Sequence, residues 1–177
     1  VLRHFHPEIA IEVLCFNDRV VRRCGRTKDL EKAQLSLDGL HADGGTALLK
    51  AVELALFDLK EKPGKRHLLV FTDGKDTEGD PGLVELIRSA KVANTTVSSI
   101  GLRTDDLDSK TLKSLALETG GHYWEAAASN DLVASFQRAA LGFRPHFYRL
   151  VFSPPETSLG PLEIRVGGEN SLLLTGK

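Results

Sequence analysis

The sequence has few cysteines and no long apolar segment, and each absence excludes a class of protein. Two cysteines occur among the 177 residues, Cys15 and Cys24. A disulfide framework or a four-cysteine zinc site needs more than two. No apolar run approaches the length of a membrane span, and the first residues lack the order of charged, apolar and small residues that marks a signal peptide.

Charge of either sign is not in excess. The 23 lysines and arginines nearly balance the 24 aspartates and glutamates, so the formal net charge is -1 and the isoelectric point is about 6.7. This balance does not provide the positive field that holds a nucleic acid or an anionic lipid surface. With 41% apolar and 27% charged residues, the composition is that of one globular domain with a sizeable core. Because the chain starts with Val1 and has no methionine, we expect it to be part of a longer protein.

Apolar runs and helical periodicity alternate regularly over residues 1–142. Strands are predicted at residues 9–16, 67–71, 95–102 and 122–126, and helices at residues 27–40, 46–60, 81–94, 108–120 and 129–141. In the second helix, the residues at helical spacing that we expect to be buried are Leu48, Leu49, Val52, Leu56 and Leu59. The alternation predicts an α/β fold with a doubly wound, mostly parallel, Rossmann-like sheet, whose functional groups lie at the carboxyl ends of its strands.

The segment at residues 19–24 differs from the other strands in its charge. It carries three arginines, Arg19, Arg22 and Arg23. We interpret it as an antiparallel edge strand that its charge protects from further pairing, with an anion-binding face as the alternative. A tight turn before it would place the two cysteines out of register, so they should not form a bridge. Cys15 is predicted to be buried and Cys24 to be a free thiol at the edge.

The C-terminal residues follow a different pattern. Residues 148–152 and 162–166 alternate apolar and polar side chains around a turn rich in proline and glycine, which predicts a β-hairpin. The sequence therefore predicts two parts, an α/β domain at residues 1–142 and a C-terminal hairpin extension at residues 143–177.

Two oxygen-bearing side chains stand out as candidate ligands. Asp73 ends a predicted strand and precedes Gly74, which places its carboxylate where open α/β sheets bind ligands, unless it only forms an Asx-turn. Thr46 begins a helix after Gly44 and Gly45, where its hydroxyl is equally suited to capping that helix. Together they are hard donors of the kind that magnesium or manganese accepts, although two ligands are too few for a closed site.

The other acids of the loop after Asp73 are interpreted differently. Asp76 and Glu78 are predicted to be solvated loop charges. Asp80 is predicted to cap the next helix, with Pro81 as its first residue.

Several motifs resemble the von Willebrand factor A-type domain family. The segments "DGGTALLKAV", "HLLVFTDGKDTEG", "SSIGL", "LALETGGHYWEA" and "DLVASFQRA" occur in the order and spacing of that family, and the span from Ile9 to Leu141 is similar to it. The tail, "YRLVFSPPE" followed by "LEIRV", looks like the extension found in a bacterial group of related proteins, many of them exported. The localisation is otherwise unknown, and an extracellular or periplasmic one is favoured by this resemblance alone.

The resemblance implies a metal-ion-dependent adhesion site. In the family, the Gly-Gly-Thr loop and the Thr-Asp-Gly strand end contribute to that site. Thr46 would then bind magnesium or manganese through its hydroxyl, and Asp73 would bind it directly or through water. Gly44, Gly45 and Gly74 would lie at the partner-binding surface. A protein partner commonly completes the coordination with an acidic side chain.

One element of the family is missing from the sequence. No Asp-x-Ser-x-Ser pattern occurs, and the residues before Ile9 resemble the end of the family's first helix, so the first strand and most of that helix are absent. The strands at 9–16 and 67–71 should then close up, or another segment or chain should lie between them, or the protein is longer, and we favour the last. For the chain itself we expect weak or no ion binding.

The function favoured by these patterns is a protein-interaction or adhesion module rather than an enzyme. A structural interaction domain that needs no metal is the alternative. "LLVFTDGKDT" superficially resembles the Asp-x-Asp-x-Thr strand end of haloacid-dehalogenase-type phosphohydrolases, but here Asp73 and Asp76 are three residues apart instead of two. Ser98 and Ser99 lack the histidine and aspartate partners that a nucleophile needs.

Overall fold

The computed structural model describes residues 2, 5–40, 44–79 and 81–143. The chain divides into two units, Val1–Pro145 and His146–Lys177, and every described residue belongs to the first. The predicted hairpin at 148–152 and 162–166 lies outside the described residues. The predicted boundary between the α/β domain and the extension, at residues 142 and 143, stays a prediction.

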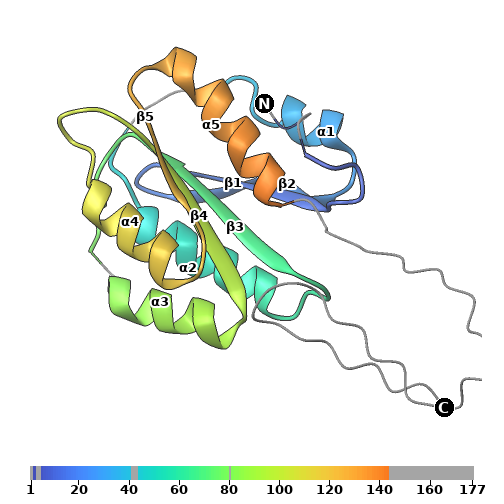
Figure 1. Ribbon diagram of the computed structural model, residues 1–177, viewed down its shortest axis with the longest axis horizontal. Helices are drawn as coiled ribbons and strands as arrows, with labels where there is room; N and C mark the ends of the chain where they lie inside the picture. The colour runs from blue at the N-terminus through green and yellow to red at the C-terminus, as the bar shows by residue number, and fades with distance from the viewer. Residues whose placement is uncertain (1, 3–4, 41–43, 80, 144–177) are drawn as a thin grey trace, which may run out of the picture. The chain divides into compact units, whose positions relative to one another are not determined.

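The strands form two separate sheets (Figure 1). The first is an antiparallel hairpin of β1 (Ile11–Phe16) and β2 (Val20–Thr27). The second is parallel, in the order β3 (Arg66–Thr72), β4 (Thr95–Leu102) and β5 (Tyr123–Ala126). The predicted α/β class, with a mostly parallel sheet and an antiparallel strand, is confirmed.

Helices cover both faces of the parallel sheet, as the doubly wound prediction requires. They are α2 (Leu48–Lys60), α3 (Leu83–Val92), α4 (Ser109–Glu118) and α5 (Ser129–Gly142), whereas α1 (Leu30–Leu35) packs on the β1–β2 hairpin. Figure 1 shows α2, α3 and α4 on one face and α5 on the other. None of the helices in the described ranges is long and apolar enough to cross a membrane.

The main core lies between the sheet and helices α2, α3 and α4. Its buried members are Leu48, Leu49, Val52, Leu56, Val70, Leu86, Ile87, Ala90, Val97, Leu112 and Leu115. The helical spacing in α2 predicted four of them, while Leu59 is only half-buried. Strand β4 is buried on both faces because helices lie above and below it.

The start of α3 differs from the prediction. The helix begins at Leu83, and its N-cap is Gly82 rather than Asp80, with the backbone of Gly82 extended at φ -66° and ψ 145°. Helical geometry therefore starts two residues after Pro81, so Pro81 is not the first helical residue. The first turn is acidic at Glu85, which suits the positive end of the helix dipole. Asp80 itself lies outside the described residues.

The two cysteines are free and out of register, as predicted. Across the hairpin, Val13 lies opposite Cys24, and Cys15 lies opposite Val21. Their burial is the reverse of the prediction, because α1 packs on β2. Cys24 is buried with Val13 and Ala33, whereas Cys15 is half-buried.

Two of the arginines of β2, Arg22 and Arg23, are engaged within the chain. Arg22 forms ion pairs with Glu12 and Asp58, and Arg23 donates hydrogen bonds to the carbonyl oxygens of Ser36 and Asp38. This pairing favours the edge-strand interpretation over an anion-binding face.

Close packing at Gly121 generates a test of the fold. A Cβ at this position would lie 1.8 Å from the carbonyl oxygen of Val97. We expect Gly121→Ala to lower the free energy of unfolding by about 2–3 kcal/mol, because the backbone of β4 cannot move away without disturbing the sheet. Urea denaturation measures the change. Gly25→Ala is the matched control, since a Cβ there meets nothing within 4 Å, and it should stay within about 0.5 kcal/mol of the parent. Equal stability of the two variants would contradict the close approach.

Candidate metal and partner site

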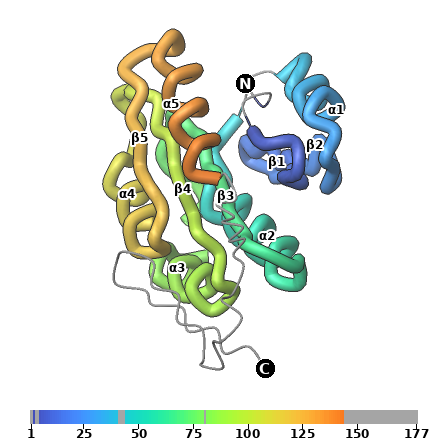
Figure 2. Tube along the Cα trace, turned by 45° about the vertical axis from the view of Figure 1, so that its right-hand side comes forward, coloured from blue at the N-terminus to red at the C-terminus, as the bar shows by residue number. Residues whose placement is uncertain are grey.

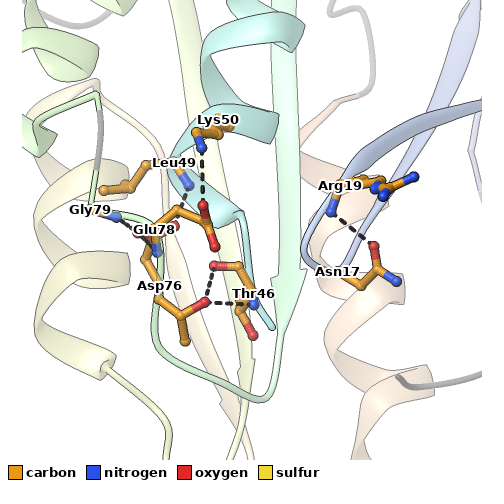
Figure 3. A network of polar contacts seen from close by, with 9 residues as sticks. Asn17, Arg19, Thr46, Leu49, Lys50, Asp76, Glu78 and Gly79 are labelled. Atoms are coloured by element: carbon orange, nitrogen blue, oxygen red, sulfur yellow. Dashed lines mark hydrogen bonds and ion pairs between the residues drawn. The ribbon is translucent and has the colours of Figure 1, made fainter. Parts of the chain in front are cut away.

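Three loops meet where the carboxyl ends of β1 and β3 lie beside the start of α2. They are the hairpin turn at Asn17 and Asp18, the loop 44–46, and the loop 73–79, and we call this region the rim. The backbone N–H of Ala47 donates to the carbonyl of Asn17, which joins the hairpin turn to the first residue before α2. Figure 3 shows the rim residues around Thr46 and Asp76.

The backbone of Thr46 is held by Thr77. The N–H of Thr46 donates to the hydroxyl of Thr77 at 3.0 Å, and the N–H of Thr77 donates to the carbonyl of Thr46 at 2.9 Å. The side-chain hydroxyl of Thr46 does not cap α2, whose N-cap is Ala47 without a side-chain hydrogen bond. The capping interpretation of Thr46 is therefore wrong.

Asp76 caps α2 in place of Thr46. Its carboxylate accepts hydrogen bonds from the backbone N–H groups of Leu49, at 2.9 Å, and of Glu78 and Gly79 in its own loop (Figure 3). Asp76 is half-buried, and Glu78 forms an ion pair with Lys50 at 3.1 Å. The prediction of a solvated charge is wrong for Asp76, because the free N–H groups of α2 attract its carboxylate from a distant loop, whereas Glu78 is exposed as predicted.

Thr46 and the end of β3 lie next to each other. The hydroxyl oxygen of Thr46 is 3.2 Å from the position that a Cβ on Gly74 would occupy. Asp73, the preceding residue, is exposed, and its carbonyl accepts a hydrogen bond from the hydroxyl of Thr104. The turn is held by the hydroxyl of Thr72, which accepts from the N–H of Gly74 at 3.2 Å. Asp73 is thus not the residue that closes this turn.

The glycines of the rim allow its three loops to approach one another closely. A Cβ on Gly45 would lie 2.9 Å from the hydroxyl of Thr77, and one on Gly44 would lie 3.2 Å from a carboxylate oxygen of Asp18. Gly44 also has a positive φ of 77°, which favours glycine. These contacts explain the glycines structurally, and their role in partner binding stays a prediction.

The oxygen donors of the rim suit a divalent ion, but few protein side chains there could act as its ligands. A threonine hydroxyl and an exposed carboxylate are hard oxygen donors, and magnesium prefers six of them, several supplied by water. In the described part of the chain, no group of three or more histidine, cysteine, aspartate or glutamate residues could hold an ion. Binding of an ion by Thr46 and Asp73 stays a prediction.

Other polar groups at this end of the sheet are paired with each other. The hydroxyl of Tyr123 donates to Glu125 at 2.8 Å, and Arg103 forms an ion pair with Glu125 at 2.6 Å. These two hydrogen bonds lower the pKa of Glu125, whereas burial and the bond to Glu125 raise the pKa of Tyr123. Glu125 is therefore ionised and already neutralised by the chain.

The serines of β4 also have structural roles. Ser99 donates to the carbonyl of Leu112, and Ser98 accepts from the N–H of His122. The ring of His122 stacks on Trp124, with centroids 5.6 Å apart. No catalytic nucleophile is formed by these residues.

The cap formed by Asp76 generates a second prediction. Asp76→Ala should lower the free energy of unfolding by about 1–2 kcal/mol, because it removes the acceptor of the α2 N-terminus and loosens the loop that holds Thr46. Thermal or urea unfolding measures this change. Asp105→Ala removes an exposed acid of a neighbouring loop and should stay within about 0.5 kcal/mol of the parent. If both variants behave alike, the cap contributes nothing.

Comparison with known proteins agrees with this geometry. The von Willebrand factor type A domain profile matches residues 2–124. A search of curated proteins found no match. Among solved structures, the chain is similar to a von Willebrand factor type A protein from Catenulispora acidiphila, with 21% identity and a TM-score of 0.69 over 78% of this chain. It spans 34% of that protein's chain.

Two further structures share the fold. The conserved hypothetical protein BatB from Bacteroides thetaiotaomicron is 20% identical, with a TM-score of 0.63, over 80% of this chain and 81% of that one. Proximal thread matrix protein 1 from the mussel byssus, solved with a zinc-occupied MIDAS motif, is 17% identical, with a TM-score of 0.56, over 73% of this chain and 34% of that one. Since the family profile covers most of its residues, the chain belongs to the von Willebrand factor type A domain family.

Proposed function

We propose that the chain is a protein-interaction module of the adhesion type and that its partner binds at the rim. Von Willebrand factor type A domains are generally interaction modules. The observation that carries the proposal is the division of roles at the rim. Asp76 caps α2 and Thr72 closes the turn, so the side chains of Thr46 and Asp73 are left for a ligand.

A magnesium or manganese ion would be held by the hydroxyl of Thr46 and the carboxylate of Asp73, with water at the remaining positions. When bound, the ion supplies a positive charge that attracts an acidic side chain of the protein partner. The mussel protein with the zinc-occupied MIDAS motif supports such a site in this fold. Gly44, Gly45 and Gly74 keep the surface open around it.

The second candidate is an interaction domain that needs no metal. It is favoured by the small number of protein donors at the rim. Excess EDTA distinguishes the two candidates, because it should abolish binding of a protein partner bridged by an ion and leave metal-independent binding unchanged.

An enzymatic role at Asp73 is not proposed. A phosphohydrolase would need a second carboxylate free to handle the proton of the leaving group. The carboxylate of Asp76 instead accepts three backbone hydrogen bonds.

Ion binding by the chain itself provides the test of the site. With two protein donors, we expect a dissociation constant for Mn²⁺ of about 1 mM or weaker. Isothermal titration calorimetry measures it, and Asp73→Asn should remove the remaining signal. Asp105→Asn is the matched control and should keep it. Micromolar binding, or binding that survives Asp73→Asn, would show that the ion is held elsewhere or by more groups.

A further inference from the structure

The loop that carries Thr46 lies between two other loops of the rim. In the described ranges β1 pairs with β2 alone and β3 with β4 alone, so the expectation that β1 and β3 close up is wrong. The hairpin lies on the β3 side of the parallel sheet, away from β5 (Figure 2). A Cβ on Gly44 would lie 3.2 Å from a carboxylate oxygen of Asp18 in the hairpin turn, and one on Gly45 would lie 2.9 Å from the hydroxyl of Thr77. The position of Thr46 is therefore set by contacts between loops.

Thr77 binds both main-chain groups of Thr46. Its hydroxyl accepts a hydrogen bond from the N–H of Thr46 at 3.0 Å and donates to the carbonyl of the same residue at 3.4 Å. The N–H of Thr77 donates to that carbonyl as well, at 2.9 Å. The peptide groups on both sides of Thr46 are thereby fixed. Because a threonine side chain has few χ1 rotamers at a given backbone conformation, the direction of its Oγ is restricted too.

The hydroxyl of Thr46 has no hydrogen-bond partner of its own among the described residues. It lies 3.2 Å from the position that a Cβ on Gly74 would occupy, and Thr46 is half-buried. No side-chain bond holds this hydroxyl, so its direction depends on the main chain that carries it. Thr77 is thus the side chain that determines where the hydroxyl of Thr46 points.

Asp73 is held independently of Thr77. The carbonyl of Asp73 accepts a hydrogen bond from the hydroxyl of Thr104, in the loop after β4. The loop around Thr77 is fixed by the carboxylate of Asp76, which accepts from one N–H of α2 and from two N–H groups of the loop itself. Removal of the Thr77 hydroxyl therefore acts on Thr46 and leaves both the loop and Asp73 in place.

We propose that Thr77 is a positioning residue of the candidate ion site and that its hydroxyl aims the Oγ of Thr46 at a divalent cation. The inference rests on the proposed ion site and names a residue on which that site depends. Thr77 itself need not contact the ion, because it acts through the main chain of Thr46. Groups that orient metal ligands in this way typically contribute about 10–100-fold to metal affinity.

Two substitutions test the hydroxyl of Thr77. Thr77→Val keeps the shape of the side chain and the N–H that bonds to Thr46 but removes the hydroxyl, whereas Thr77→Ser keeps the hydroxyl. Titration of the intact chain with Mg²⁺, followed through the NMR amide shifts of Thr46 and Asp73, gives the dissociation constant. We expect Thr77→Val to raise this constant about tenfold and Thr77→Ser to leave it as in the parent.

A second measurement needs no ion. Without Mg²⁺, the amide hydrogen of Thr46 should exchange with solvent faster in Thr77→Val than in the parent, because its acceptor is lost. In Thr77→Ser it should exchange at the parental rate, since the acceptor is kept.

Thr119→Val is the matched control for a loss of stability alone. The hydroxyl of Thr119 accepts from the N–H of Val97 and donates to the carbonyl of Leu115, toward the amino end of β4 and away from the rim. Its removal should lower the melting temperature. The Mg²⁺ affinity and the amide exchange of Thr46 should stay as in the parent.

Several results would overturn the inference. Equal Mg²⁺ affinity of the parent and Thr77→Val, or equal amide exchange at Thr46, would show that the hydroxyl does not position Thr46. A Thr77→Ser or Thr119→Val variant as weak as Thr77→Val would show that the effect does not come from this hydroxyl. A parent without any Mg²⁺ response would overturn the proposed ion site and this inference with it. A response that is equal in all variants would overturn this inference alone, so the two failures are distinguishable.

Discussion

The carboxylate of Asp76 is the interaction on which the rim depends. It satisfies an N–H at the start of α2 and two N–H groups of its own loop, so one side chain fixes the loop 73–79 against the helix. The reciprocal bonds between Thr46 and Thr77 then add a second connection between the two loops. Because these bonds already satisfy the backbone groups at the start of α2, the hydroxyl of Thr46 does not cap the helix and lies beside Gly74 instead.

Local sequence patterns predicted most of the secondary structure because each depends on neighbours along the chain. The spacing of Leu48, Val52 and Leu56 identified α2, and the β-branched and apolar run at residues 95–102 identified β4. The start of α3 was less predictable, because the N-cap is Gly82, two residues after the expected cap at Asp80. Tertiary contacts decided the burial of Cys24, which α1 covers.

Only those residues of the candidate site that belong to a recognisable sequence motif were predictable. Thr46 and Asp73 were identified by their loops and by family resemblance. Asp76 and Thr77 were not, since their partners lie 27 and 31 residues away in sequence. An aspartate after a strand has no local feature that distinguishes a solvated charge from the cap of a distant helix. Strand pairing has the same limit, because the apolar sequence of β3 does not specify which strand lies beside it.

The bond between Asn17 and Ala47 has a consequence for the stability of the hairpin. It connects the turn of the β1–β2 hairpin to the residue that follows Thr46. Local opening of the hairpin would therefore break a contact of the loop 44–46, and local opening of that loop would break a contact of the hairpin turn. Two segments about thirty residues apart in sequence are thus joined at their turns.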